Sequence, residues 1–189
     1  MQKKKQICII KLGAMGDVLR TTPILWNFRK ADVTWVTEKP AFALLRNIPG
    51  VKKIVAISDL VQLKQLVFDE IYNFDEDPRA CLLASALPAK KKKGFTFKNG
   101  SYWPFDADSE YAFALTKNDE LKFKLNKKTY QQVIFEMAGF FWEGQDYLLG
   151  YRPKSKIRYD IGINYRVAKK FPNKAWPHWK RLAKLLKSV

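Results

Sequence analysis

The sequence has few of the residues that build metal centres and disulfide frameworks. Its 189 residues include one histidine, His178, and two cysteines. A structural zinc site needs several cysteine or histidine ligands, so a zinc finger and a histidine-rich metal site are both excluded. Cys8 and Cys81 stand in the apolar contexts QICIIK and RACLLA, which indicates buried, reduced thiols and no disulfide framework.

Long apolar runs are also absent. No stretch approaches the ~18 residues of a helix that spans a membrane. The opening MQKKKQICIIK imitates a signal peptide, but Lys11 and Asp17 interrupt its apolar run too early. Together with the reduced cysteines, these absences predict a cytoplasmic protein.

Acidic residues are scarce beside basic ones. The chain has 35 lysines and arginines against 18 aspartates and glutamates, a formal charge of +17. Such an excess favours anionic partners, which include nucleic acid, a membrane surface and phosphorylated substrates. The lysines at 90–93 form a continuous basic run without interleaved aromatic residues. We therefore interpret this run as a charged entrance to a strand and expect no specific nucleic-acid contact there.

Strand-like and helix-like segments alternate through the first half of the chain. The run QICIIK is β-branched and apolar, which is typical of a strand buried on both faces of a parallel sheet. A tight turn is expected at 16–21, and Thr22 and Pro23 suit the start of a helix at about 22–30. Such units predict an α/β fold, with a parallel sheet flanked by helices. Further strands are expected at 33–38, 52–58, 69–75 and 91–97, and further helices at 41–48, 59–66 and 78–87.

The pattern is less regular between residues 98 and 150. The segment NGSYWPF indicates a turn or flap, and ADSEYAFALT indicates a helix. Residues 117–128 are interpreted as a charged, extended stretch, because their apolar positions alternate. Residues 129–142 predict a strong helix, since their apolar residues fall on one face at helical spacing.

The C-terminal part of the sequence indicates the beginning of a second α/β domain. A linker is expected at 151–158, followed by a strand at 159–167, a basic loop and a final helix. We therefore divide the chain into a first domain at 1–150, the linker, and the start of a further domain at 159–189. About 30 residues are too few to bury a core alone.

The motif GAMGD follows the first strand. Ligands of open parallel sheets bind at the carboxyl ends of the strands, which is where this motif lies. Its two glycines, Gly13 and Gly16, permit a tight turn and close approach of a ligand to the backbone. Asp17 is either a general base at the mouth of the crevice or a helix cap. The other candidate substrate contacts of this loop are Ala14, Met15 and Arg20.

The motif NFDEDPRA follows the fourth strand and lies at the same edge. Asp77 either caps the helix that begins at Pro78 or takes part in substrate binding. Arg79 can bind a carboxylate or a phosphate through both arms of its guanidinium. The three acids of this motif are weak evidence for a metal site.

A basic loop, KKFPNKAWP, precedes the final helix. Lys170 and Lys174 in this loop are candidate phosphate ligands, because the loop leads into a helix N-terminus. A solvated basic loop without a ligand is the alternative.

Several motifs together resemble glycosyltransferase family nine, the ADP-heptose:lipopolysaccharide heptosyltransferases and their relatives. They are IIKLGAMGDVLRTTP, NFDEDPRA with LPAKKKKGF, EYAFAL with LKFKLNKKTYQQVIFEMAG, and IGINYRVAKKFPNKAWP. The resemblance implies two Rossmann-like halves in the arrangement called GT-B. The N-terminal half would bind the acceptor, and the C-terminal half would bind the nucleotide-sugar donor.

The resemblance also implies a reaction. Asp17 would be the general base in an inverting transfer of a heptose or related sugar to a lipopolysaccharide core acceptor. Lys174, or Lys170 if the loop register differs, would contact the donor phosphates. The donor would be ADP-heptose, with no cofactor and no metal. The acceptor would be a phosphorylated, lipid-linked saccharide at the cytoplasmic face of the inner membrane, with peripheral contact to the anionic membrane surface.

The sequence departs from the family at two places. It reaches only the first strand, loop and helix of the donor half, so we expect an incomplete donor site and an inactive chain, unless a second chain completes it. Residues 165–168 are YRVA, where the family often has a glycine-rich stretch. The alternatives are a non-catalytic acceptor-binding module or remnant, and a basic nucleic-acid-binding domain.

Overall fold

The computed structural model describes residues 4–63, 66–151, 160–167, 169 and 171–187. The chain divides into two compact units, residues 1–152 and residues 153–189.

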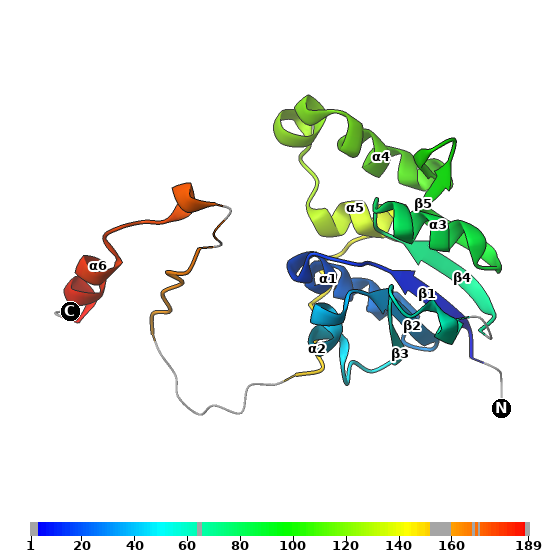
Figure 1. Cartoon of the computed structure of the whole chain (residues 1–189), viewed down its shortest axis with the longest axis horizontal. Coiled ribbons are helices and arrows are strands. Elements are labelled where there is room, and N and C mark those ends of the chain that lie inside the picture. The colour runs from blue at the N-terminus through cyan, green and yellow to red at the C-terminus, as the bar shows by residue number, and fades with distance from the viewer. Residues whose placement is uncertain (1–3, 64–65, 152–159, 168, 170, 188–189) are drawn as a thin grey trace. The chain divides into compact units, whose positions relative to one another are not determined.

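The first unit is built on one six-stranded sheet with the order β3-β2-β1-β4-β5-β6. All neighbouring strands are parallel except β5 and β6, which form an antiparallel hairpin (Figure 1). This arrangement confirms the predicted α/β fold with a parallel sheet. The strands are β1 (Gln6–Ile10), β2 (Asp32–Thr37), β3 (Val51–Ala56), β4 (Phe68–Asn73), β5 (Ala89–Lys98) and β6 (Ser101–Pro104).

The central strand β1 is buried on both faces, as its apolar sequence predicts. Ile7 and Ile9 belong to one core cluster, and Cys8 and Ile10 belong to another. Successive side chains of a strand point to opposite faces of the sheet, so this short run supplies both cores at once. The pairing of β1 with β2 and β4 places the loop after Ile10 at the middle of the carboxyl edge.

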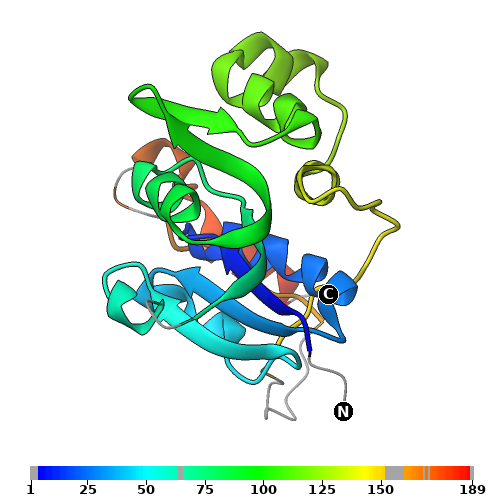
Figure 2. The same ribbon diagram turned by 90° about the vertical axis from the view of Figure 1, so that its right-hand side faces the viewer.

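Helical segments cover both faces of the sheet (Figures 1 and 2). Residues of η1 and α5 complete the core on the side of Ile7 and Ile9, and residues of α3 complete the core on the side of Cys8 and Ile10. The segments are α1 (Met15–Thr21), η1 (Thr22–Phe28), η2 (Lys39–Ala41), α2 (Phe42–Leu45), η3 (Leu60–Leu63), α3 (Pro78–Ala86), η4 (Ala107–Ser109), α4 (Glu110–Lys117), η5 (Leu121–Leu125) and α5 (Tyr130–Met137).

The predicted turn at 16–21 and helix at 22–30 are wrong in detail. The segment 15–21 is already the α-helix α1, and the residues after it form the 3-10 helix η1. The change occurs at Thr22, whose hydroxyl and backbone N–H both donate to the carbonyl of Leu19. Pro23 has no N–H with which to continue the α-helical ladder, so the chain tightens at this point.

The extended stretch predicted at 117–128 is also wrong. Residues 119–125 are helical, and η5 closes with a 2.7 Å hydrogen bond from the Asn126 N–H to the Leu121 carbonyl. The Asn118 side chain starts the turn by accepting from the Leu121 N–H at 2.9 Å. The alternating apolar residues therefore do not mark a strand here, because local capping favours a helical turn.

Two further predicted helices keep their type but are shorter than expected. The helix expected at 41–48 is an α-helix only at Phe42–Leu45, and it is followed by Asn47, which has a φ of 63°. The helix expected at 129–142 ends at Met137, two residues before Gly139, which has a φ of 74°. Residues of positive φ end a right-handed helix, which explains both early stops.

The second unit contains α6 (Trp179–Leu186) and the short η6 (Pro172–Lys174). The final helix is therefore confirmed. The strand predicted at 159–167 is not formed over the described residues 160–167, and residue 159 lies outside the described residues. None of the helices in the described parts of the chain has the length and apolarity needed to span a bilayer.

Candidate active site

A pocket of about 380 Å³ opens at the carboxyl edge of the sheet, beside the loop that follows β1. Residues of α4 and α5 form its apolar wall, and residues after β1 and β4 bring polar groups to it. This edge is where open parallel sheets bind their ligands. The charged lining residues are Lys11, Asp17, Arg20, Asp75, Glu76 and Lys122.

Asp17 lies in the first turn of α1 and lines this pocket. Its side chain is 33% exposed, and its Oδ1 accepts a 2.5 Å hydrogen bond from Nη2 of Arg20. Ala14 is the N-cap residue, and no side chain caps this helix terminus. The carboxylate is thus open to the pocket and is not engaged in a helix cap.

The GAMGD loop leaves open space beside its backbone. A Cβ added to Gly13 or Gly16 would meet no atom within 4 Å. Neither glycine has a positive φ, so the backbone conformation does not itself require glycine here. Gly13 lines the pocket, whereas Ala14 and Met15 are exposed beside it. The loop could accept a ligand close to its main chain.

Tyr130, the first residue of α5, supports the Asp17–Arg20 pair. The Arg20 guanidinium lies 4.1 Å from the centre of the Tyr130 ring, in a cation–π contact. The Tyr130 hydroxyl lies 3.3 Å from Oγ1 of Thr21, which donates to the Asp17 carbonyl at 2.8 Å. Burial is the main cause that raises the pKa of Tyr130, so the phenol stays protonated. Sequence reasoning missed this residue.

Lys11 and Asp75 form a buried ion pair in the pocket wall. Nζ of Lys11 lies 3.2 Å from Oδ2 of Asp75 and donates to the Phe74 carbonyl at 3.1 Å. The same carboxylate oxygen accepts from the Leu12 N–H at 2.9 Å. Burial acts to lower the pKa of Lys11, but the negative charges of Asp75, its ion-pair partner, and of Asp17 outweigh burial and leave the pKa raised. Lys11 therefore carries its charge inside the wall.

Asp77 and Arg79 lie after β4 but are not among the described residues that line the pocket. Asp77 caps α3, because its Oδ1 accepts from the Arg79 N–H at 2.8 Å. The Arg79 guanidinium binds both Asp77 and Glu38, each at 2.8 Å. Hydrogen bonds from the Arg79 side chain are the main cause that lowers the pKa of Asp77. Both arms of Arg79 are thus occupied by carboxylates.

The candidate donor residues belong to the second unit. Lys174 ends η6, is exposed, and has its Nζ 4.4 Å from the centre of the Phe171 ring. Lys170 lies outside the described residues. The expected juxtaposition of Lys174 and Asp17 across a cleft stays a prediction.

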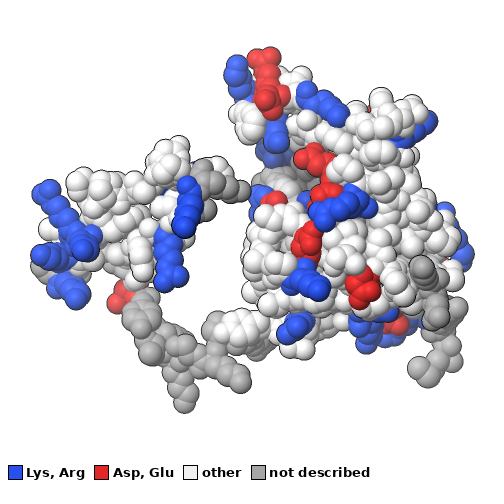
Figure 3. Space-filling view, in the orientation of Figure 1, with Lys and Arg blue, Asp and Glu red and all other residues white. Residues whose placement is uncertain are grey.

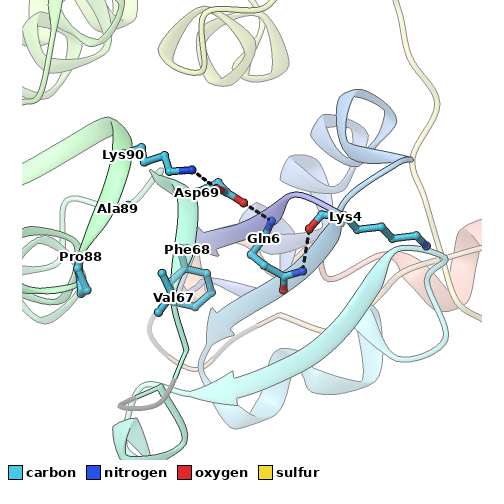
Figure 4. Close-up of a pocket in the computed structure, with 8 residues that line it drawn as sticks. All are labelled: Lys4, Gln6, Val67, Phe68, Asp69, Pro88, Ala89 and Lys90. Atoms are coloured by element: carbon cyan, nitrogen blue, oxygen red, sulfur yellow. Dashed lines mark hydrogen bonds and ion pairs between the residues drawn. The ribbon is translucent and has the colours of Figure 1, made fainter. Parts of the chain in front are cut away.

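A larger cavity of about 600 Å³ lies at the opposite, amino edge of the sheet (Figure 4). Its polar groups already bind one another, since Asp69 accepts from the Gln6 N–H at 2.9 Å and from Lys90 at 3.0 Å. The carboxyl-edge pocket combines an accessible carboxylate with open backbone and is the better candidate. Within the described ranges, no three His, Cys, Asp or Glu side chains are grouped as a metal site requires.

Comparisons with known proteins agree with the resemblance seen in the sequence. The chain is 30% identical over 104 residues to the lipopolysaccharide core heptosyltransferase OpsX of Haemophilus influenzae. The match covers 48% of this chain and 30% of the length of that relative. No protein-family model matches the chain.

Among solved structures, the chain is similar to the heptosyltransferase WaaC of E. coli, solved with ADP. The TM-score is 0.53 at 16% identity, over 96% of this chain and 63% of that structure, which is a likeness of fold. A family 9 glycosyltransferase from Veillonella parvula matches over 51% of this chain and 33% of its own length, at 23% identity and a TM-score of 0.44. The sequence match and the likeness of fold to WaaC confirm the resemblance to heptosyltransferases.

Proposed function

We propose that this chain, which resembles the heptosyltransferases of glycosyltransferase family nine, takes part in sugar transfer to a lipopolysaccharide core. The reaction is an inverting transfer of a heptose or related sugar from a nucleotide-diphosphate sugar, ADP-heptose. The observation that carries the proposal is the accessible Asp17 carboxylate in a pocket at the carboxyl edge of the sheet. The similarity to a heptosyltransferase supports the choice of sugar.

In the proposed reaction, an acceptor hydroxyl attacks C1 of the donor sugar while the bond from C1 to the diphosphate oxygen breaks. The hydroxyl proton passes to the Asp17 carboxylate, which must lie within hydrogen-bond reach of it. The transition state resembles an oxocarbenium ion, as in glycoside hydrolysis. The nucleoside diphosphate leaves with the electron pair of the broken bond.

Arg20 and Tyr130 give the carboxylate a defined position for this role. Arg20 binds one oxygen of Asp17 at 2.5 Å, and the Tyr130 ring supports the guanidinium from the side of α5. A base held in one orientation needs less reorganisation when the hydroxyl arrives. The second carboxylate oxygen is the one we assign to the acceptor proton.

The leaving diphosphate gains negative charge in the transition state, so a cation must meet it. We assign this part to Lys174, with Lys170 as the alternative, and no metal is needed in the scheme. The acceptor is a phosphorylated, lipid-linked saccharide at the cytoplasmic face of the inner membrane. The formal charge of +17 favours such an anionic substrate and surface.

Two measurements test the proposal. The first is transfer of heptose from ADP-heptose to a heptose-deficient lipopolysaccharide by this chain supplied with a complete donor half. The second is calorimetric binding of ADP and ADP-heptose to the 189-residue chain and to that completed form. Transfer by the completed form supports the proposal. A completed form that neither binds the donor nor transfers the sugar contradicts it and favours a non-catalytic binding module.

A further inference from the structure

The end of α4 and the helical turn after it form a part of the first unit that the proposed chemistry does not use. We call residues 117–128 the tip. In Figure 1 the tip stands out from the rest of the first unit, at the upper end of the green-to-lime helices. Its sequence, KNDELKFKLNKK, is dominated by lysines and large apolar residues.

The tip exposes two large apolar side chains. Phe123 is 74% exposed and Leu125 is 63% exposed. Neither belongs to the two core clusters of the first unit or to the partly buried residues packed against them. The fold of the described first unit therefore gives these side chains no packing role, and exposed apolar groups rimmed by polar residues mark interaction sites.

Lysines surround these apolar side chains. The tip has five lysines and two acidic residues, so its formal charge is 5 − 2 = +3. Lys124 lies 3.6 Å from Glu120, a pair between two exposed side chains, and such pairs contribute little. Figure 3 shows Lys and Arg atoms at this end of the first unit, together with Asp and Glu atoms and uncharged residues. The partner that complements this surface is therefore negatively charged and has an apolar layer.

The tip adjoins the candidate active site. Lys122 belongs to the tip and lines the pocket that holds Asp17. Leu115 and Thr116 of α4, just before the tip, line the same pocket. A surface bound by the tip would thus lie next to the entrance through which an acceptor reaches Asp17.

We propose that the tip docks on an anionic phospholipid bilayer, with Phe123 and Leu125 entering the headgroup layer and the lysines binding lipid phosphates. Helical segments with apolar and basic side chains bind membrane interfaces through both contributions. Nucleic acid suits the tip less well, because single-stranded binding relies on aromatic platforms in a basic groove. The inference rests on the proposed function in one respect, which is that the bilayer is the source of the acceptor.

The test is co-sedimentation of the 189-residue chain with vesicles of phosphatidylcholine alone and of phosphatidylcholine mixed with phosphatidylglycerol. We expect binding to the mixed vesicles only.

Lys124→Gln with Lys127→Gln should weaken that binding by about 30-fold, since two cations near the surface are removed. Phe123→Ser with Leu125→Ser should weaken it by about 10-fold, since two apolar side chains no longer enter the interface. All four side chains are exposed, so the fold should persist, and thermal unfolding checks it.

The matched control changes exposed residues of the same kinds elsewhere in the first unit. Val61→Ser with Val67→Ser removes two exposed apolar side chains, and Lys52→Gln with Lys98→Gln removes two exposed lysines. Each control pair should leave vesicle binding within about 5-fold of the binding by the unaltered chain, because at most one of the removed lysines lies near the bilayer. Tip variants that bind as well as the unaltered chain, or controls that lose as much as the tip variants, overturn the proposal. The assay involves no sugar transfer, so its outcome is independent of whether the proposed reaction occurs.

Discussion

Lys11 is a charged residue at the end of an apolar strand that the fold nevertheless buries. Its ammonium lies 3.2 Å from the Asp75 carboxylate, and both side chains are about nine-tenths buried. Removing one member of such a pair leaves the other charged and buried. The pair joins the ends of β1 and β4, so it also fixes the pocket wall.

We predict that Lys11→Met lowers the free energy of unfolding by about 3–5 kcal/mol. Lys11→Met combined with Asp75→Asn should lose less than the sum of the two single changes, because no unpaired charge remains. Urea denaturation of the three variants measures this coupling. Strictly additive losses would show that the two side chains do not interact.

The contribution of Glu70 to the stability of the fold should depend on pH. Burial acts to raise its pKa, but hydrogen bonds from Lys5 and Tyr72 and the charges of Lys5 and Lys91 outweigh burial and lower the pKa overall. A carboxyl whose pKa is lower in the folded state stabilises the fold above its unfolded pKa of about 4.3, and this stabilisation is lost as the pH falls through the folded pKa.

Accordingly, Glu70→Gln should lower the free energy of unfolding by about 1 kcal/mol near neutral pH. The difference between the variant and the unaltered chain should shrink as the pH falls below about 4. Denaturation at several pH values measures it. A difference that stays constant down to acid pH would contradict the assignment, and Glu143→Gln, at an exposed position, serves as the control.

Sequence reasoning identifies the residues of the candidate site that lie in strand-end loops and misses those that tertiary packing adds. Asp17 and Arg20 are near neighbours in one motif. Tyr130 contacts Thr21, the residue after Arg20, from 109 residues away along the chain, and Lys122 joins the same pocket from the helical tip. No local pattern encodes such contacts, because they depend on how α4, α5 and the sheet pack together.

At the scale of elements, Gly94 controls the pairing of β4 and β5. It lies opposite Asn73 in the parallel register and has a φ of 89°. A Cβ at this position would stand 1.8 Å from the Asn73 carbonyl oxygen, so the two strands could not keep their separation.

We therefore predict that Gly94→Ala lowers the free energy of unfolding by at least about 2 kcal/mol more than Gly100→Ala. Gly100 is the matched control: its φ is 78°, but a Cβ there meets nothing within 4 Å. It should lose only about 1 kcal/mol from the strained backbone. Equal losses, measured by urea denaturation, would show that the clash with Asn73 is relieved elsewhere.

Most elements of the first unit follow from apolar patterning, whereas their ends and the tip do not. The five strands predicted for the parallel sheet are all present. Four contain apolar or β-branched residues between turns, and β5 follows the lysine run with the apolar residues Phe95 and Phe97. Pro23 and Gly139 shift helix boundaries through backbone geometry. The segment 117–128 has an alternating pattern, but capping by Asn118 makes it helical. An alternating pattern alone does not distinguish a strand from an exposed helical turn.

At the scale of the whole molecule, both hydrophobic core clusters lie within the first unit. We therefore predict that residues 1–152 alone unfold in one cooperative transition, with a Tm within about 5 °C of that of the 189-residue chain. Calorimetry measures both. A fragment without a cooperative transition would show that residues 153–189 contribute to the stability of the sheet.

The proposed reaction requires more than one unit. Asp17 belongs to the first unit and Lys174 to the second, and their approach across a cleft is an inference from the family resemblance. The similarity to E. coli WaaC over 96% of this chain is a likeness of fold, so the approach of these two residues stays a prediction. The sequence alone predicts the two candidate residues but not the distance between them, because that distance depends on how two units are packed.

The central claim is that the Asp17 carboxylate accepts the proton of the acceptor hydroxyl. Its most direct test is the rate of heptose transfer by the Asp17→Asn variant of this chain supplied with a complete donor half, with donor affinity and thermal unfolding measured in parallel. We predict a loss in turnover of about 10²–10⁴-fold, the usual contribution of a general base, with the fold and donor affinity retained. Turnover close to that of the unaltered protein would contradict the account.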